Sequence, residues 1–257
     1  VGNWYGTWKD AGFPGAWAPG TPGVNGRVTD GTTSTDFGCL PIKTPGTGAN
    51  YLTELTMGAS VNHSHLFFDV LWINSGLTVT TTTAQSITTP TLPARDVNGT
   101  TNGEGLMIGL MFTAASTNAA AIANSTVSYT NSTGTSGRTA TLSAIAGSQI
   151  PATPVIGTMI WFNLQAGDKG VQSIQSITLA TSLVTGSISL FIARDLANIG
   201  TSLVNVQFTR KLSDPGVRLY NGTCMLHCIL ASATTATFSA TTTITTTRRG
   251  ETTMIGR

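Results

Sequence analysis

Three apolar stretches follow one another between residues 157 and 193, separated by the turn-forming clusters 166–170 and 184–187. In the last stretch Ile188, Leu190 and Ile192 occupy every second position. A period of two that is bounded by Gly, Asp and Ser predicts half-buried β-strands joined by tight turns. This is the strongest structural signal in the chain.

Similar apolar segments recur on both sides of this region. The segments 51–59 and 65–74 (HLFFDVLWIN) are predicted to form a strand pair, and 126–131 with 138–145 a hairpin. Further strands are predicted at 105–113, 203–211, 224–232 and 236–248.

Three segments between these strands are predicted to differ. The Thr-rich segment 77–93 contains Pro90 and Pro93 and is assigned to a sheet edge or a loop. Segment 114–124, with three consecutive alanines, is the one candidate for a helical turn or two, and 195–201 is expected to be a loop. The predicted fold class is therefore all-β, a β-sandwich or jelly-roll-like domain.

Residues 1–50 are predicted to form an extended N-terminal arm, and residues 51–257 an antiparallel β domain. The arm is rich in Gly and Pro, which disfavours a regular helix or a central strand. It nevertheless carries the large aromatic side chains Trp4, Tyr5, Trp8, Phe13 and Trp17. Such side chains need a surface to cover them. Three alternatives remain open: the arm folds back on its own domain, it wraps around a neighbouring subunit, or it stacks on sugars or single-stranded nucleic acid.

Composition narrows the possible partners. Charged residues make up 9% of the chain, whereas about a quarter of an average soluble protein is charged. The net charge of +2 provides no long-range attraction for nucleic acid or anionic lipid. No apolar run approaches the roughly 18 residues that span a bilayer. We expect neither nucleic acid nor membrane as a partner. A weakly charged surface favours an assembled, homo-oligomeric state, and a monomer with a polar surface is the alternative.

The cysteines and histidines give weak signals. Cys39, Cys224 and Cys228 are odd in number, and buried thiols are favoured over a bridge from Cys39 to one of the other two. On one strand Cys224 and Cys228 lie about 13 Å apart, too far for a disulfide. His63 and His65 share a strand face, but no further metal-binding motif accompanies them, so ordinary histidines at a strand start are expected. His227 is predicted to face away from the two nearby cysteines, which argues against a Cys/His catalytic pair.

Carboxylates are scarce, with 11 Asp and Glu in all. Asp168, Asp195 and Asp214 are assigned to turns, where Asp serves backbone geometry. Asp69 lies inside an apolar strand and needs a partner, so a structural hydrogen bond or ion pair is favoured over a functional role. The chain has no nucleophile-elbow, P-loop or dinucleotide motif. We therefore expect no enzymatic activity, no catalytic residues, no metal and no cofactor.

Several phrases of the chain resemble virion structural proteins of tailed bacteriophages: TTPTLPARDVNGT, TNGEGLMIGLMFTAASTNAAAI, VSYTNSTGTSGRTATLSAI and GDKGVQSIQSITLATSLVTGSISLFIARDL. The resemblance covers roughly residues 88–199 and defines no site, so no functional residue is carried over. It implies an all-β, oligomeric protein held by contacts with repeated capsid or tail subunits. Such proteins are often head decoration (cement) proteins, tail components or host-binding proteins.

Both lines of reasoning lead to one functional prediction. We expect a trimeric capsid-associated decoration protein that binds the major capsid protein or other virion subunits, with the arm gripping a neighbour. Its location would be the virion, assembled in the bacterial host cytoplasm. The alternative is a tail or fibre component that binds host surface glycans, with Trp4, Trp8, Trp17 or Tyr129 stacking on the sugar rings. A polysaccharide depolymerase is a third and weaker candidate.

Overall fold

The computed structural model describes residues 4–6, 22–31, 40–42, 48–60, 62–145, 147–201, 203–214, 216–231 and 240–249. These residues form strands, turns and loops without a helix, which confirms the all-β prediction. The strands are arranged in one eight-stranded and two four-stranded sheets, and every pairing between them is antiparallel. Among the described residues no helix is long and apolar enough to cross a membrane.

The strands comprise long ones of six to fourteen residues and short ones of two to five residues. In chain order they are β1 (Trp4–Gly6), β2 (Arg27–Val28), β3 (Leu40–Pro41), β4 (Ala49–Ala59), β5 (His63–Ile73), β6 (Gln85–Ser86), β7 (Leu106–Ala114), β8 (Thr126–Asn131), β9 (Arg138–Thr141), β10 (Thr158–Trp161), β11 (Val171–Thr178), β12 (Ser187–Gly200), β13 (Gln207–Lys211), β14 (Val217–Leu219), β15 (Cys224–Ala231) and β16 (Ala240–Arg249).

The largest sheet closes on itself. Its order is β2-β5-β12-β7-β10-β1-β15-β3, and β5 pairs in addition with β15. The six strands β5, β12, β7, β10, β1 and β15 therefore form a complete ring of hydrogen-bonded neighbours, a small β-barrel. Because closure leaves no exposed edge in the ring, the barrel is protected from pairing with other chains.

Side chains fill the barrel. Its interior is a buried apolar cluster to which β5, β7, β10, β12 and β15 contribute. Gly109 on β7 lies opposite Phe191 on β12, and a Cβ at Gly109 would overlap the Phe191 ring. The Phe191 ring in turn meets the Trp161 ring edge-on, with centroids 5.1 Å apart. The interior is thus a packed core rather than a channel.

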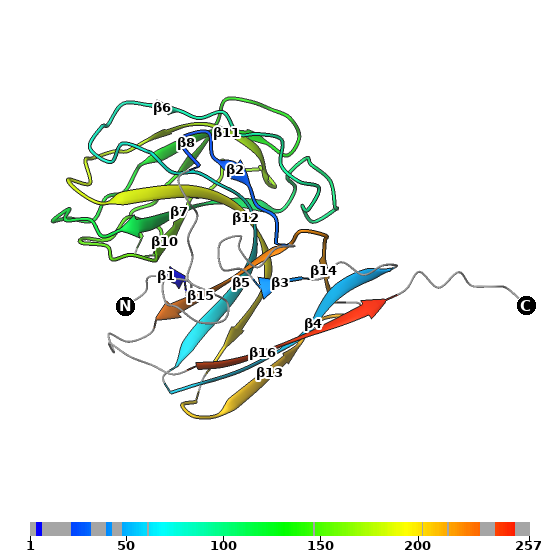
Figure 1. The fold of residues 1–257 in the computed structure, drawn as a ribbon. Helices are drawn as coiled ribbons and strands as arrows, with labels where there is room; N and C mark the ends of the chain where they lie inside the picture. The colour runs from blue at the N-terminus through cyan, green and yellow to red at the C-terminus, as the bar shows by residue number, and fades with distance from the viewer. Residues whose placement is uncertain are drawn as a thin grey trace, which may run out of the picture.

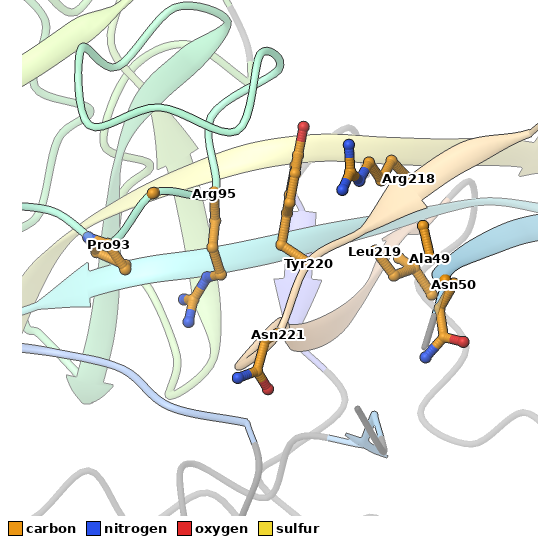
Figure 2. Close-up of a pocket in the computed structure, with 10 residues that line it drawn as sticks. Ala49, Asn50, Pro93, Arg95, Arg218, Leu219, Tyr220 and Asn221 are labelled. Atoms are coloured by element: carbon orange, nitrogen blue, oxygen red, sulfur yellow. The ribbon is translucent and has the colours of Figure 1, made fainter. Parts of the chain in front are cut away.

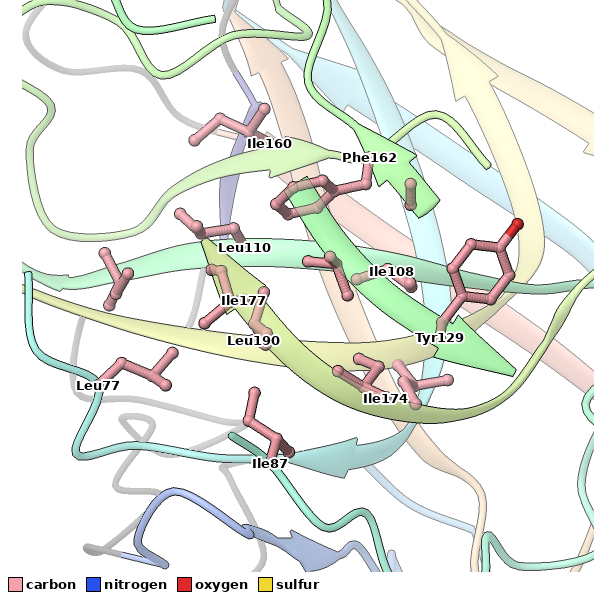
Figure 3. Close-up of a cluster of buried hydrophobic side chains, with 14 of the residues drawn as sticks. Leu77, Ile87, Ile108, Leu110, Tyr129, Ile160, Phe162, Ile174, Ile177 and Leu190 are labelled. Atoms are coloured by element: carbon pink, nitrogen blue, oxygen red, sulfur yellow. The ribbon is translucent and has the colours of Figure 1, made fainter. Parts of the chain in front are cut away.

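One four-stranded sheet, of order β6-β11-β8-β9, covers one part of the barrel's outer face. Figure 1 shows β8 and β11 on the side of the barrel strands opposite β4, β13 and β16. The space between this sheet and the barrel holds the largest apolar cluster among the described residues, part of which Figure 3 shows. Its members include Ile108, Leu110, Leu190, Tyr129 and Ile174.

Strand β11 reaches this cluster with an unusual spacing. Val171, Ile174 and Ile177 are fully buried although they are three residues apart rather than two. Register shifts between Val171 and Ser173 and between Ile174 and Ser176 mark two irregularities in the pairing of β11 with β8. Each such bulge inserts one extra residue into the strand, so every third residue can point to the same face.

The second four-stranded sheet places β13 and β14 along one edge of β4 and β16 along the other. It covers the remaining part of the barrel's outer face through a smaller cluster around Leu52, Leu55, Phe67 and Leu196. The outer faces of β5 and β12 therefore belong to the first cluster at one end and to the second at the other. Between the two flanking sheets lies a seam, which Asp69 and Arg194 occupy.

The hairpin 126–131/138–145 and the edge position of segment 77–93 are confirmed, since β8 pairs with β9 and β6 is the outermost strand of its sheet. The predicted pairing of 51–59 with 65–74 is wrong. β4 and β5 lie in different sheets, because β5 is apolar on both faces and needs a layer on each side. The prediction of three strands within residues 157–193 is confirmed, but β11 belongs to a different sheet from β10 and β12.

Two further expectations are wrong. Segment 114–124 forms no helical turn, because the buried side chains of Ser116 and Asn118 bind nearby groups and Ile122 bridges to Ile150. Segment 195–201 is not a loop, since β12 continues to Gly200. Asp195 is therefore a strand residue, exposed on β12, whereas Asp168 and Asp214 do lie at turns.

Part of the N-terminal segment also departs from expectation. The backbone of Trp4–Gly6 forms a central strand between β10 and β15, although no central strand was expected in the Gly- and Pro-rich region. These three residues precede the first proline, Pro14, so nothing in them prevents strand pairing. β4 begins at Ala49, close to the predicted start of the β domain, and the division at residue 50 stays a prediction.

Candidate functional site

The seam between the flanking sheets contains a buried ionic network. Asp69 of β5 is fully buried and pairs with Arg95, whose Nε lies 3.2 Å from Asp69 Oδ2. Arg194, directly opposite on β12, places Nη2 3.8 Å from the same oxygen. The backbone N–H of Cys224 donates to Asp69 Oδ1 at 2.9 Å, and the Thr223 hydroxyl donates to Oδ2 at 3.3 Å.

Arg95 joins segments that are far apart in the sequence. Its Nη2 donates to the Val70 carbonyl at 2.8 Å and to the Thr29 hydroxyl at 3.0 Å. Its Nη1 donates to the Thr29 carbonyl at 2.9 Å and to the Gly222 carbonyl. One guanidinium thus holds β5, the end of β2 and the turn before β15 together.

Burial raises the pKa of Asp69, while the charges of Arg95 and Arg194 and the hydrogen bonds from Cys224 and Thr223 lower it. Burial likewise lowers the pKa of Arg194, and Asp69 opposes this. An arginine does not give up its proton in a protein, so the guanidiniums of Arg95 and Arg194 stay charged and favour the ionised carboxylate of Asp69. The prediction that Asp69 serves a structural ion pair is confirmed.

A pocket of about 410 Å³ opens beside this network. Its walls come from three segments: residues 48–50 at the start of β4, residues 93–95, and residues 218–221, which span the end of β14 and the turn that follows it. Figure 2 shows Arg95 and Tyr220 side by side in front of β5, with Arg218 beyond the Tyr220 ring. The guanidinium carbons of Arg194 and Arg218 each lie 4.9 Å from the centroid of this ring.

The loop that follows Arg95 is held by Asp96. Its carboxylate accepts the N–H groups of Asn98, Thr100, Gly103 and Glu104, and the Thr100 hydroxyl at 2.6 Å. Burial acts to raise the pKa of Asp96, but the hydrogen bonds from Thr100 and its neighbours outweigh it and lower the pKa. This arrangement fixes one wall of the pocket in a defined conformation.

The three histidines gather on the outer face of the barrel beneath the second flanking sheet. His63 and His65 lie on β5 and their ring centroids are 6.1 Å apart. The Nδ1 atom of His65 lies 2.9 Å from Nε2 of His227 on β15, and the His227 ring stacks on Phe67 at 4.7 Å. His63 and His65 do open a strand and share a face, as predicted.

These histidines are neutral at physiological pH. Burial lowers the pKa of His65 to about 4, and the charge of His63 contributes in the same direction. Burial and the charge of His65 lower the pKa of His227 to about 3. Within the part of the chain that the structure describes, no group of three or more His, Cys, Asp or Glu side chains is placed to hold a metal ion.

A second polar cluster lies at the rim of the first flanking sheet. Asp168 accepts two hydrogen bonds from Arg138, at 2.9 and 3.0 Å, one from Asn131 at 2.8 Å, and one from the Tyr129 hydroxyl. The hydrogen bond from Arg138, opposed by burial and aided by Tyr129, lowers the pKa of Asp168 to about 2. Tyr129 itself is fully buried on β8, so the expectation that it stacks on a sugar is wrong.

The described cysteines follow the alternation of β15. Cys224 and Cys228 are buried in the barrel interior, whereas His227 points outward to Phe67, as predicted. Burial raises the pKa of the Cys228 thiol well above its ordinary value, and its Sγ lies 3.4 Å from Met159 Sδ. Cys39 lies outside the described residues, and so does any bridge from it.

The structure describes little of the aromatic residues of the arm. Trp4 and Tyr5 are described through the backbone of β1 alone, and Trp8, Phe13 and Trp17 lie outside the described residues. Their assignment to a subunit contact therefore stays a prediction.

The seam was only partly predictable. Asp69 stood out as a charge inside an apolar strand, and the same signal in SISLFIARDL would have found Arg194. Arg95, Arg218 and Tyr220 carry no such signal, because they lie in or beside turns where polar residues are ordinary. Their proximity depends on which strands pair.

Comparisons with protein-family models, with curated proteins and with solved structures give no match for this chain.

Proposed function

We propose that this protein is a structural component of a tailed bacteriophage virion, most specifically a capsid-associated decoration (cement) protein that stabilises the head lattice. In this role it is not an enzyme and needs no cofactor. Its partners are the major capsid protein or other virion subunits, and it acts as a homo-oligomer, with three copies as the expected number. It works by burying surface at subunit junctions.

The observation that carries the proposal is that the buried charged groups pair with one another, while the remaining polar residues are mostly uncharged. The buried groups Asp69, Arg95 and Arg194 are engaged with one another and with the backbone, and the histidines are neutral. The polar residues that remain are mainly Thr, Ser, Asn and Gln. A rigid all-β body with a weakly charged surface suits close contact with other subunits better than chemistry on a substrate.

Localisation on purified particles tests the proposal. An antibody against this chain should label the head at high copy number when particles are imaged. Labelling restricted to the tail would favour the second candidate below. An absence of labelling on intact particles, with the protein found free, would contradict both.

A test of the arm's role requires a variant that leaves the barrel intact. Removing residues 1–23 would delete β1 and leave β10 and β15 without the strand between them. The triple variant Trp8→Ala, Phe13→Ala, Trp17→Ala keeps β1 and should abolish binding to particles that lack the protein, with an unchanged circular dichroism spectrum. Undiminished binding would contradict the gripping role. Tyr51→Ala, an aromatic replacement in β4 outside the arm, is the matched control.

A second candidate is a tail or fibre component that binds host surface glycans. The observation in its favour is the pocket beside Arg95 and Tyr220. Tyr129, one of the aromatic residues considered for this role, is buried. A glycan array probed with the purified protein tests it, and an array without binding counts against it.

A further inference from the structure

We infer that the seam pocket is a binding site for a carboxylate-bearing sugar, such as a uronic acid unit, with Arg218 as the residue that pairs with the carboxylate. The inference rests on the pocket's geometry and goes beyond the virion role, since it holds wherever on a particle the protein lies.

The pocket has the dimensions of a small-molecule site. Its volume of about 410 Å³ falls within the range of about 300–1,000 Å³ that is usual for such sites. Its walls are well supported: buried Arg95 makes one ion pair and four hydrogen bonds, and Asp96 holds the adjoining loop through five hydrogen bonds. A site with walls of this kind is formed before the ligand arrives, which lowers the cost of binding.

The charge of the lining points to an anion. Arg95 and Arg218 contribute guanidinium groups, and the lining contains no carboxylate. Arg95 already spends its donors on Asp69 and on backbone carbonyls. Arg218 is exposed and, within the described part of the chain, has no carboxylate partner, so its guanidinium is available to a ligand. Its position over the Tyr220 ring reduces the freedom it would lose on pairing.

The rest of the lining selects among anions. Pro93 and Ala94 present apolar surface beside the polar groups of Asn50 and Asn221 in the lining. A sugar ring offers both kinds of surface, and a uronic acid adds the planar carboxylate that a guanidinium binds through two parallel hydrogen bonds. Inorganic phosphate would use the charge but not the apolar wall.

Titration calorimetry with the purified full-length protein tests the inference, with D-glucuronate, D-glucose and inorganic phosphate as probes. We expect glucuronate to bind about tenfold more tightly than glucose, because its carboxylate can accept two parallel hydrogen bonds from Arg218 that glucose cannot. Arg218→Ala should remove this preference, and Arg218→Lys should retain part of it. Because Arg218 is exposed, these variants should keep the wild-type melting temperature.

Two further variants separate the pocket from general surface charge. Arg210→Ala removes an exposed arginine on β13, outside the pocket lining, and should leave glucuronate binding unchanged. Ala94→Trp fills the pocket without altering charge and should abolish binding. Equal binding of phosphate and glucuronate, equal loss in Arg210→Ala, or no binding of glucuronate at millimolar concentration would each overturn the inference. None of these results would bear on where the protein lies in a particle.

Discussion

The two flanking sheets are attached to the same barrel by different means. The sheet that contains β8 and β11 covers a large apolar cluster, and its ion pair between Arg138 and Asp168 lies at the rim. The sheet that contains β4 covers a smaller cluster that borders His65, His227 and the Asp69 network. The first attachment rests on buried area, which does not depend on pH. The second depends on the protonation and pairing of particular side chains, and the pocket lies next to it.

The largest effect is expected from the charge at the centre of the seam. Asp69→Asn leaves the buried guanidiniums of Arg95 and Arg194 without their carboxylate, and we expect a loss of about 3–5 kcal/mol in the free energy of unfolding. Denaturant unfolding measures this. The exposed neighbour Asp195→Asn is the control and should change stability by about 0.5 kcal/mol or less. A loss for Asp69→Asn no larger than the control's would show that the network does not hold the seam.

A cavity on the apolar side should cost nearly as much. Leu110 is fully buried between β7 and the first flanking sheet, so Leu110→Ala should lower the free energy of unfolding by about 3 kcal/mol. The loss should be the same at pH 7 and pH 5, because no titrating group contacts the site through a hydrogen bond or ion pair. A loss that changes with pH would break the contrast between the two attachments.

Acid should weaken the histidine side selectively. The pKa of His65 is about 4 in the folded protein and 6.5 without burial, so between these values the unfolded chain binds more protons. The contribution of His65 to the free energy of unfolding is therefore fully present above pH 6.5. It is lost as the pH falls towards 4, and the loss is roughly 3 kcal/mol for His65 alone. His227, with a pKa of about 3, extends the loss to lower pH. Melting temperatures recorded from pH 7.5 to pH 4 measure this.

The matched variant for the acid experiment replaces both hydrogen-bonding rings. His65→Leu with His227→Phe removes the titrating pair together, so that neither ring is left without its partner. Its melting temperature should vary less than the wild type's between pH 6.5 and 4. An identical pH profile would assign the acid sensitivity to other groups. The carboxylates Asp96 and Asp168 do not confuse this window, because their lowered pKa values place their effect below pH 4.

The smallest of these effects is expected in the interior of the barrel, to which both flanking sheets are attached. Gly109→Ala places a methyl group where the Phe191 ring lies, and the ring must shift against Trp161. We expect a loss of about 1–3 kcal/mol, measured by denaturant unfolding and independent of pH. Gly58→Ala on β4 is the control, since a Cβ there would meet the Gln207 side chain, which can move. Equal losses in the two variants would mean that the interior is not tightly packed.

Local patterns in the sequence determined the strands. Alternation located β8, because burial of one face imposes a period of two on a regular strand. β7 and the first part of β12 stood out as apolar runs between turn residues, since both of their faces are buried. The charge of Asp69 inside an apolar run was sufficient to predict a buried hydrogen bond or ion pair. The low content of charged residues was readable at once and still carries the functional proposal.

Only the tertiary structure decided which strands are neighbours. The closure of the barrel through β5 and β15 joins residues about 160 positions apart, such as His65 and His227. Such pairings depend on the fit of whole layers, so no local pattern records them. The period of three in β11 became intelligible through its bulges, and Arg95, Arg218 and Tyr220 became a pocket because three distant segments end at one seam. The chain encodes its strands locally, and it encodes its site through the packing of those strands.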